Sequence, residues 1–257
     1  MAKDFLSSVV QEITVVYDGV VQLDLIWQGA TPRPGQFFLL KPSRGGYFLG
    51  RPISVARWQR PIAREALILS FLIAEKGGGT RELSHLHPEE SVLATGPLGN
   101  SWQDMPLPAV PGGDAAIALV GGSIGIAPLL AFAQALEMGS YDFYAGFKTL
   151  PFCLEDITPR KKIIATEGGA EGVQGLILDF FEPAGYSAVY ACGPHPMLKA
   201  VSQQCEAVGV PCYISLERPM ACGVGACLGC TVRTRDGNRR CCTDGPIFSS
   251  REVLFDE

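Results

Sequence analysis

Apolar residues recur in short runs over the first hundred residues, and several of these runs alternate with polar positions. We interpret six of them as strands, at residues 5–17, 20–27, 36–40, 54–56, 67–73 and 91–95. Turn residues such as Asp18-Gly19 separate the runs. Short strands at this spacing are typical of a β-barrel or a β-sandwich. A short helix is expected after Gly79, with Thr80 as its cap.

The pattern changes after residues 105–114, a segment with three Pro and two Gly that we interpret as a linker. Continuous apolar runs then alternate with helix-like stretches. Strands are expected at 115–120, 141–147, 163–166, 188–192 and 211–216, and helices at 127–137, 173–181 and 195–208. This alternation indicates βαβ units around a parallel sheet, whose strands are apolar throughout because helices cover both faces.

Composition and charge narrow the class of protein. The chain has 257 residues, of which 47% are hydrophobic and 18% are charged, and its net charge is −5. It lacks the clustered cations that nucleic-acid binding needs, apart from the short run Arg160-Lys161-Lys162. No apolar run approaches the ~20 residues of a membrane span, and the N-terminus does not have the pattern of a signal peptide. We therefore expect a cytoplasmic protein.

The nine cysteines are unevenly spread, and five of them lie between residues 222 and 242. Cys222, Cys227 and Cys230 have the spacing Cys-x4-Cys-x2-Cys of plant-type [2Fe–2S] ligands, which a later cysteine completes. Intervening glycines allow the backbone to curl with its N–H groups directed at sulfur. For the fourth ligand we choose Cys242 over the adjacent Cys241, because it precedes the Asp-Gly-Pro turn. A structural zinc site is the alternative, although zinc ligands favour Cys-x2-Cys pairs.

Two motifs in the β-rich part suit a flavin nucleotide when they occur together. Arg51-Pro52-Ile53-Ser54 offers a cation for a pyrophosphate and a hydroxyl for the edge of the isoalloxazine ring. Gly77-Gly78-Gly79-Thr80 opens the expected helix and lets backbone N–H groups approach a phosphate. Each motif alone is more often an ordinary turn or a flexible connection.

Two further motifs suit a nicotinamide nucleotide. The run Gly121-Gly122-Ser123-Ile124-Gly125 follows an expected strand and opens an expected helix, which is the context of a dinucleotide-binding loop. The run Cys192-Gly193-Pro194 ends another expected strand, beside the crevice where the nucleotide would lie. The alternative interpretation of Cys192 is a buried thiol in a strand.

The four motifs, in this order, resemble those of the ferredoxin–NADP⁺ reductase superfamily. With the cysteine segment 220–230, nearly the whole chain resembles the electron-transfer subunit of class 1B dihydroorotate dehydrogenase. The resemblance implies an α+β multidomain fold. An antiparallel β-barrel (1–104) would hold FAD, a central α/β parallel-sheet domain (105–210) would bind NAD, and a small C-terminal domain (211–257) would hold the [2Fe–2S] cluster.

The resemblance also implies site residues. The predicted FAD contacts are Arg51, Pro52, Ile53, Ser54, Leu72, Ile73, Ala74, Gly79 and Thr80. The predicted nucleotide contacts are Gly121, Gly122, Gly125, Cys192, Gly193 and Pro194. The predicted cluster ligands are Cys222, Cys227, Cys230 and Cys242. The chain departs from the family pattern at Ala74, where many relatives have a polar residue, and at Ser123, where relatives usually have Gly.

The function implied is electron transfer in pyrimidine biosynthesis. A separate FMN-containing catalytic subunit would oxidise dihydroorotate, and this chain would pass the electrons through [2Fe–2S] and FAD to NAD⁺, with NADP open as the alternative nucleotide. The expected assembly is a heterotetramer of two subunits of each kind. One alternative is a reductase subunit that serves another partner, such as a hydrogenase or a transhydrogenase. The other is a zinc-bound structural module.

Overall fold

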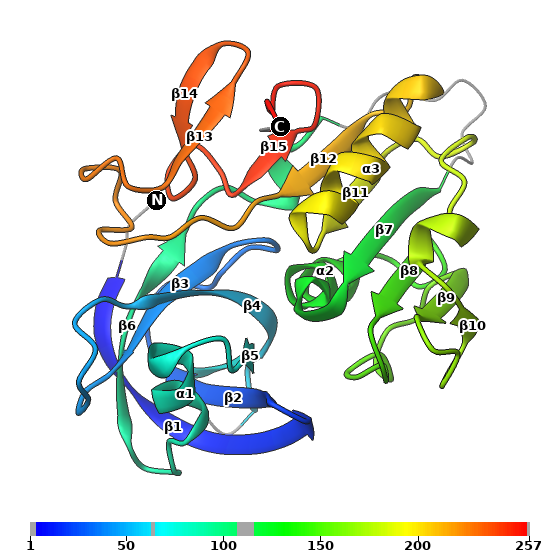
Figure 1. Cartoon of the computed structure of the whole chain (residues 1–257). Coiled ribbons are helices and arrows are strands. Elements are labelled where there is room, and N and C mark those ends of the chain that lie inside the picture. The colour runs from blue at the N-terminus through cyan, green and yellow to red at the C-terminus, as the bar shows by residue number, and fades with distance from the viewer. Residues whose placement is uncertain (1–3, 63–64, 107–115, 256–257) are drawn as a thin grey trace.

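Six antiparallel strands close into a barrel in the order β1-β2-β5-β4-β3-β6 (Figure 1). The computed structural model describes residues 4–62, 65–106 and 116–255. The barrel interior is filled by large side chains, including Trp27 and Phe38, whose rings meet edge to face at 4.9 Å. The expectation of a barrel is therefore confirmed. Its strands are β1 (Asp4–Tyr17), β2 (Val20–Trp27), β3 (Phe37–Pro42), β4 (Arg51–Gln59), β5 (Leu67–Ala74) and β6 (Ser91–Leu98).

A short helix, α1 (Gly78–Ser84), covers one end of the barrel beside β3 and β5. Its N-cap is Gly77, so the expectation that Thr80 caps the helix is wrong. Thr80 lies inside the first turn instead. Its hydroxyl oxygen accepts hydrogen bonds from the backbone N–H groups of Lys76 (3.0 Å) and Gly77 (3.1 Å). Thr80 therefore fixes the glycine turn from within the helix.

The second half of the chain forms a seven-stranded sheet in the order β10-β9-β8-β7-β11-β12-β15. Every pair of neighbouring strands is parallel except β12 and β15. Helix α2 contacts both β7 and the barrel strand β4, so it lies between the two halves (Figure 1). The elements are β7 (Ile117–Gly122), α2 (Ile126–Gln134), β8 (Tyr141–Phe147), β9 (Lys161–Thr166), β10 (Val173–Gln174), β11 (Val189–Cys192), α3 (His195–Ala207), β12 (Cys212–Ser215) and β15 (Ile247–Ser249).

The helix expected at 173–181 is absent from the described structure. Residues there form the short strand β10 and a 3₁₀ helix, η3 (Ile177–Phe180). Gly172 and Gly175 have φ of 73° and 130°, a conformation that ends a right-handed helix. Two other 3₁₀ helices are η1 (Trp102–Asp104) and η2 (Ser123–Gly125). The expected linker falls mostly at residues 107–115, which lie outside the described residues.

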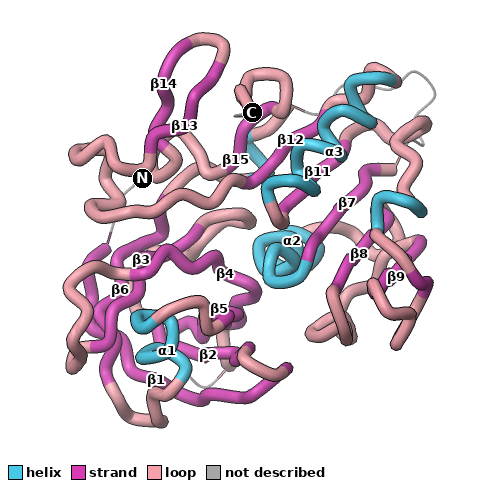
Figure 2. The backbone as a smooth tube through the Cα atoms, in the orientation of Figure 1, coloured by secondary structure: helices cyan, strands magenta, loops and turns pink. Residues whose placement is uncertain are grey.

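The last part of the chain joins the sheet and the barrel. Strands β12 and β15 both belong to the sheet, so the expected domain boundary at residue 210 divides the sheet. Between them the chain runs past the barrel and forms a hairpin of β13 (Thr231–Thr234) and β14 (Gly237–Arg240), seen at the top of Figure 2. Val232 and Cys230 are buried in a core shared with Leu39 of the barrel.

None of the described helices is long and apolar enough to cross a membrane.

Candidate functional site

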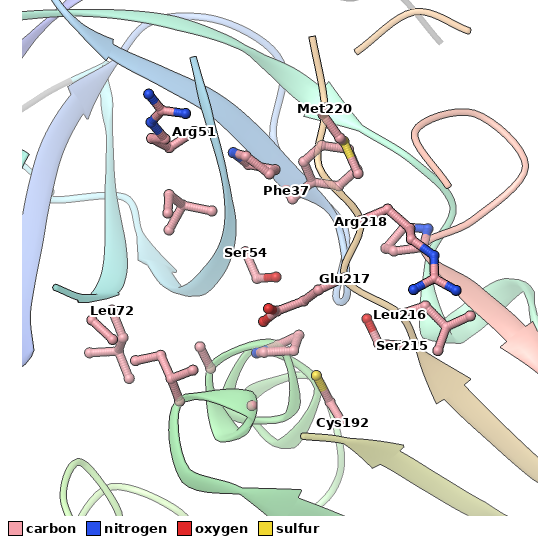
Figure 3. Close-up of a pocket in the computed structure, with 18 of the residues that line it drawn as sticks. Phe37, Arg51, Ser54, Leu72, Cys192, Ser215, Leu216, Glu217, Arg218 and Met220 are labelled. Carbon is pink, nitrogen blue, oxygen red and sulfur yellow. The ribbon is translucent and has the colours of Figure 1, made fainter. Parts of the chain in front are cut away.

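A cavity of about 400 Å³ lies where the barrel, α2 and the segment after β12 meet (Figure 3). Seven of the nine predicted FAD contacts line it, all from the barrel side. Gly125 and Cys192 line it from the sheet side. The seven barrel residues are Arg51, Pro52, Ile53, Ser54, Leu72, Ala74 and Thr80. Strand β4 begins at Arg51, so the whole Arg-Pro-Ile-Ser motif lies on one strand along this wall.

The other two predicted FAD contacts lie behind the wall. Ile73 is fully buried in the barrel core, because alternation along β5 turns its side chain away from those of Leu72 and Ala74. Gly79 lies against Arg51: a Cβ at residue 79 would be 2.0 Å from the Arg51 Nε. The missing side chain of Gly79 is therefore what leaves room for the Arg51 guanidinium.

Arg51 has the surroundings of an anion-binding cation. It is half-buried, it lines the cavity, and it forms no ion pair with any described carboxylate. The first turn of α1 lies directly beside it. A partly desolvated guanidinium without a carboxylate partner fits a pyrophosphate, whose oxygens accept its planar set of N–H donors.

The predicted nucleotide residues gather where two neighbouring strands end. Cys192, at the end of β11, pairs in register with Gly121 of β7. The loop after β7 then approaches β11 so closely that a Cβ at Gly125 would lie 2.5 Å from the carbonyl oxygen of Cys192. Gly193 is similarly close to Gly122. Ligands of open parallel sheets bind at the carboxyl ends of such strands.

Cys192 faces the cavity as a neutral thiol. Burial, together with the nearby Glu217 carboxylate, raises its pKa to about 12. Figure 3 shows its sulfur directed toward the space that Ser54 and Glu217 also face. A thiol with so high a pKa is a poor nucleophile at neutral pH, so a packing or contact role fits it better.

The cavity also contains three charged residues that the sequence patterns did not predict, namely Lys76, Glu217 and Arg218. Lys76 follows β5 and Glu217 follows β12, and their charged groups lie 3.7 Å apart. This ion pair joins the barrel to the segment after the sheet. Each of the three residues lies two or three positions after the end of a strand, and this position was the available signal.

The cysteine segment turns backbone N–H groups toward sulfur. Cys222 Sγ accepts from Val224 N–H (3.5 Å) and from Cys227 N–H (3.4 Å), and Cys227 Sγ accepts from Gly229 N–H (3.5 Å). The N–H groups of Val224 and Cys227 lower the pKa of Cys222 to about 6. A loop that stabilises thiolates in this way suits ligands of iron.

The cysteines lie in two pairs. Cys222 contacts Cys227, and Cys230 Sγ accepts from the backbone N–H of Cys242 at 3.4 Å. No three Cys, His, Asp or Glu side chains within 4–62, 65–106 and 116–255 converge on a single metal ion. A binuclear cluster is wider and takes two thiolates at each iron, so two neighbouring pairs fit it better than they fit one tetrahedral zinc.

Comparison with known proteins agrees with this geometry. Residues 217–254 match the family model of the iron–sulfur cluster binding domain of dihydroorotate dehydrogenase B. The dihydroorotate dehydrogenase B (NAD⁺) electron transfer subunit of Clostridium acetobutylicum is 37% identical and is matched over 100% of both chains. The chain belongs to this family of electron transfer subunits. The subunit of Clostridium perfringens is 34% identical over 99% of this chain and 100% of that protein.

Solved structures of oxidoreductases share the fold of this electron transfer subunit. The NADH-dependent reduced ferredoxin–NADP oxidoreductase, studied for flavin-based electron bifurcation, aligns with a TM-score of 0.81 and 25% identity. The alignment covers 97% of this chain and 90% of that one. The ferredoxin reductase of carbazole 1,9a-dioxygenase, at 19% identity and a TM-score of 0.65, covers 83% of this chain and 69% of its own and shares the fold.

Proposed function

We propose that the chain is the electron transfer subunit of an NAD-linked dihydroorotate dehydrogenase, an oxidoreductase of pyrimidine biosynthesis. It takes electrons from a catalytic subunit that oxidises dihydroorotate and delivers them, by way of [2Fe–2S] and FAD, to NAD⁺. Full-length identity of 37% with a named subunit supports this function.

One structural relationship carries the proposal. The segment after β12 lines the flavin cavity from Ser215 to Met220, and the first predicted cluster ligand, Cys222, follows two residues later. The cavity and the cysteine group therefore share one short piece of backbone. Two redox groups held this way lie close together, as transfer of single electrons between them requires.

The residues of the cavity divide between the parts of FAD. Arg51 and the turn at Gly79 and Thr80 would hold the pyrophosphate. The hydroxyl of Ser54 would meet the edge of the isoalloxazine ring. The neighbouring backbone would line the ring. On β4 this backbone belongs to Pro52 and Ile53, and on β5 to Leu72, Ile73 and Ala74. When bound, FAD supplies the conversion between single-electron transfer and hydride transfer.

The nucleotide would bind on the sheet side of the same cavity. Gly121, Gly122 and Gly125 let the loop after β7 approach a phosphate, and Gly193 and Pro194 continue the wall from Cys192. Both groups of residues line or adjoin the cavity that the FAD residues share. This arrangement supports hydride exchange between a flavin and NAD, because the two rings would stack in one space.

The cluster ligands would be Cys222, Cys227, Cys230 and Cys242. The apolar residues Val224 and Leu228 lie in the same loop and are 47% and 62% exposed. Exposed apolar side chains beside a redox centre suit docking of an FMN-containing catalytic subunit there. We extend the proposal to a heterotetramer of two subunits of each kind.

All nine cysteines are free thiols, which fits a reducing cytoplasm.

The visible spectrum of anaerobically purified protein, before and after NADH, tests the proposal. Flavin bands and broad iron–sulfur absorption are expected, and NADH should bleach both. Colourless protein after anaerobic handling would contradict the cofactor assignment, and iron and zinc analysis would identify the alternative. The isolated chain should not oxidise dihydroorotate, and if it does, the assignment as an electron transfer subunit fails.

A second candidate is a reductase subunit that serves another partner, of hydrogenase or transhydrogenase type. The TM-score of 0.81 with the NADH-dependent reduced ferredoxin–NADP oxidoreductase favours it. Purification of the native complex separates the two functions, because a co-purifying dihydroorotate-oxidising subunit supports the first and any other redox partner supports the second.

A further inference from the structure

The loop between β3 and β4 (residues 43–50) lies against the proposed FAD site, and the sequence analysis gave it no role. The loop reads Ser-Arg-Gly-Gly-Tyr-Phe-Leu-Gly and leads directly into Arg51. Two neighbouring aromatic residues of the loop differ sharply in their surroundings. Tyr47 is 44% exposed and contacts α1 and Arg51, whereas Phe48 is 86% exposed and lies over Lys41.

Tyr47 and the glycine turn both contact Arg51. The guanidinium carbon of Arg51 lies 5.5 Å from the centroid of the Tyr47 ring, within the range of a cation–π contact. Arg51 also occupies the space that a Cβ at Gly79 would fill. The hydroxyl of Tyr47 in turn occupies the space in front of Gly78. The side chain of Arg51 therefore contacts both an aromatic ring and a stretch of backbone without side chains.

The loop that carries Tyr47 is anchored to the same helix. The Glu82 carboxylate, on α1, accepts a hydrogen bond from the backbone N–H of Gly46 at 2.8 Å. Gly45 also lies tightly against this carboxylate, because a Cβ there would be 2.6 Å from Oε2. The loop is thus tied to α1 immediately before Tyr47, which keeps the backbone of Tyr47 beside α1 and Arg51.

We propose that Tyr47 is a positioning residue for FAD, which holds the Arg51 guanidinium against the glycine turn in the orientation that receives the pyrophosphate. The proposal rests on the proposed FAD site. An arginine has large rotamer freedom, and restricting it before the ligand arrives lowers the entropy that binding must overcome. Tyr47 therefore strengthens FAD binding through Arg51 rather than through a contact of its own.

FAD release from the diluted holoprotein, followed by the recovery of flavin fluorescence, tests the proposal. Loss of a cation–π contact predicts that Tyr47→Ala raises the Kd for FAD by about 2- to 30-fold. Tyr47→Phe keeps the ring and should bind FAD as the wild type does. Phe48→Ala is the matched control on the same loop and should also leave the Kd unchanged. Iron content of each variant reports whether the fold and cluster are intact.

A double-mutant comparison separates positioning from a general structural role. If Tyr47 acts through Arg51, Tyr47→Ala should add almost nothing to the loss caused by Arg51→Ala. An unchanged or lower Kd for Tyr47→Ala, or full additivity with Arg51→Ala, would overturn the proposal. A wild-type protein that carries no FAD would instead overturn the proposed function, so the two failures are distinguishable.

Discussion

The thiol of Cys241 donates a hydrogen bond to the carbonyl oxygen of Leu216, with 3.1 Å between the sulfur and the oxygen. Burial raises the pKa of this thiol to about 12, so it remains protonated. The next residue, Cys242, instead donates its backbone N–H to Cys230 Sγ. Two adjacent cysteines therefore have different surroundings. Both donate their backbone N–H to Cys230, Cys241 to its carbonyl oxygen at 3.0 Å and Cys242 to its sulfur, but only Cys242 also brings its own sulfur into contact with the Cys230 sulfur.

This difference predicts opposite results for two serine substitutions. Cys242→Ser should lose the iron–sulfur absorption and most of the bound iron, because a thiolate ligand is removed. Cys241→Ser should keep both, since a hydroxyl can donate to Leu216 in place of the thiol. Iron and sulfide analysis with visible spectra checks the pair. A colourless Cys241→Ser with a coloured Cys242→Ser would reverse the ligand assignment.

Gly79→Ala should weaken FAD binding by displacing Arg51. The added Cβ would meet the Arg51 Nε at 2.0 Å, so the guanidinium must leave its position. Loss of one hydrogen bond to a charged group, worth about 1.5–3 kcal/mol, predicts a Kd raised by roughly 10- to 150-fold. Gly168→Ala is the control, because it lies outside the FAD motifs and nothing lies within 4 Å of a Cβ there. Equal FAD affinities for both variants would count against the role of Arg51.

Local sequence patterns were enough to predict much of this protein. The barrel strands and most of the sheet follow from apolar runs, and the Cys222–Cys230 spacing identifies cluster chemistry within nine residues. The motif starting at Arg51 is equally local, since it lies along one strand. The prediction failed at 173–181, where the apolar residues suggested a helix and the conformations of Gly172 and Gly175 exclude it.

The features that sequence reasoning missed depend on contacts between distant segments. Strand β15 is three residues long and exists through its pairing with β12, more than thirty residues earlier. Lys76 and Glu217 meet only because the barrel and the sheet pack together. The contact of Tyr47 with Arg51 likewise requires a folded loop anchored by Glu82. No local period or spacing encodes such contacts.

Gly125→Ala should impair the nucleotide site while sparing FAD. The new Cβ would lie 2.5 Å from the backbone carbonyl of Cys192, so the loop after β7 must move. We expect the rate constant for flavin reduction by NADH to fall at least about tenfold, because small displacements of a reacting ring are costly. Gly168→Ala is the control, as no atom lies within 4 Å of its Cβ. A normal rate in Gly125→Ala would contradict the assignment.

Stability should fall in alkaline solution partly because of Cys192. Burial raises its folded pKa to about 12, above the 9.0 of a free thiol. The folded state favours the neutral thiol of Cys192. The contribution of this thiol to the free energy of unfolding is therefore fully present below pH 9 and is lost as pH rises toward 12. The free energy of unfolding should drop by at most about 1.4 kcal/mol per pH unit from this group. Cys192→Ser should show a shallower decline above pH 9, and an equally steep decline would contradict this origin.

Ser123→Gly should stabilise the protein. Ser123 has φ of 51°, it is exposed, and its hydroxyl makes no hydrogen bond within the described part of the chain. A left-handed conformation costs a residue with a Cβ about 1–2 kcal/mol, whereas glycine adopts it freely and loses about 0.5–1 kcal/mol through its more flexible unfolded state. The net gain in the free energy of unfolding is about 0–1.5 kcal/mol, centred near 0.75 kcal/mol. It should raise Tm by up to roughly 6 °C. Differential scanning calorimetry of the holoprotein measures this shift, and a lower Tm for Ser123→Gly would mean that the serine side chain stabilises the loop.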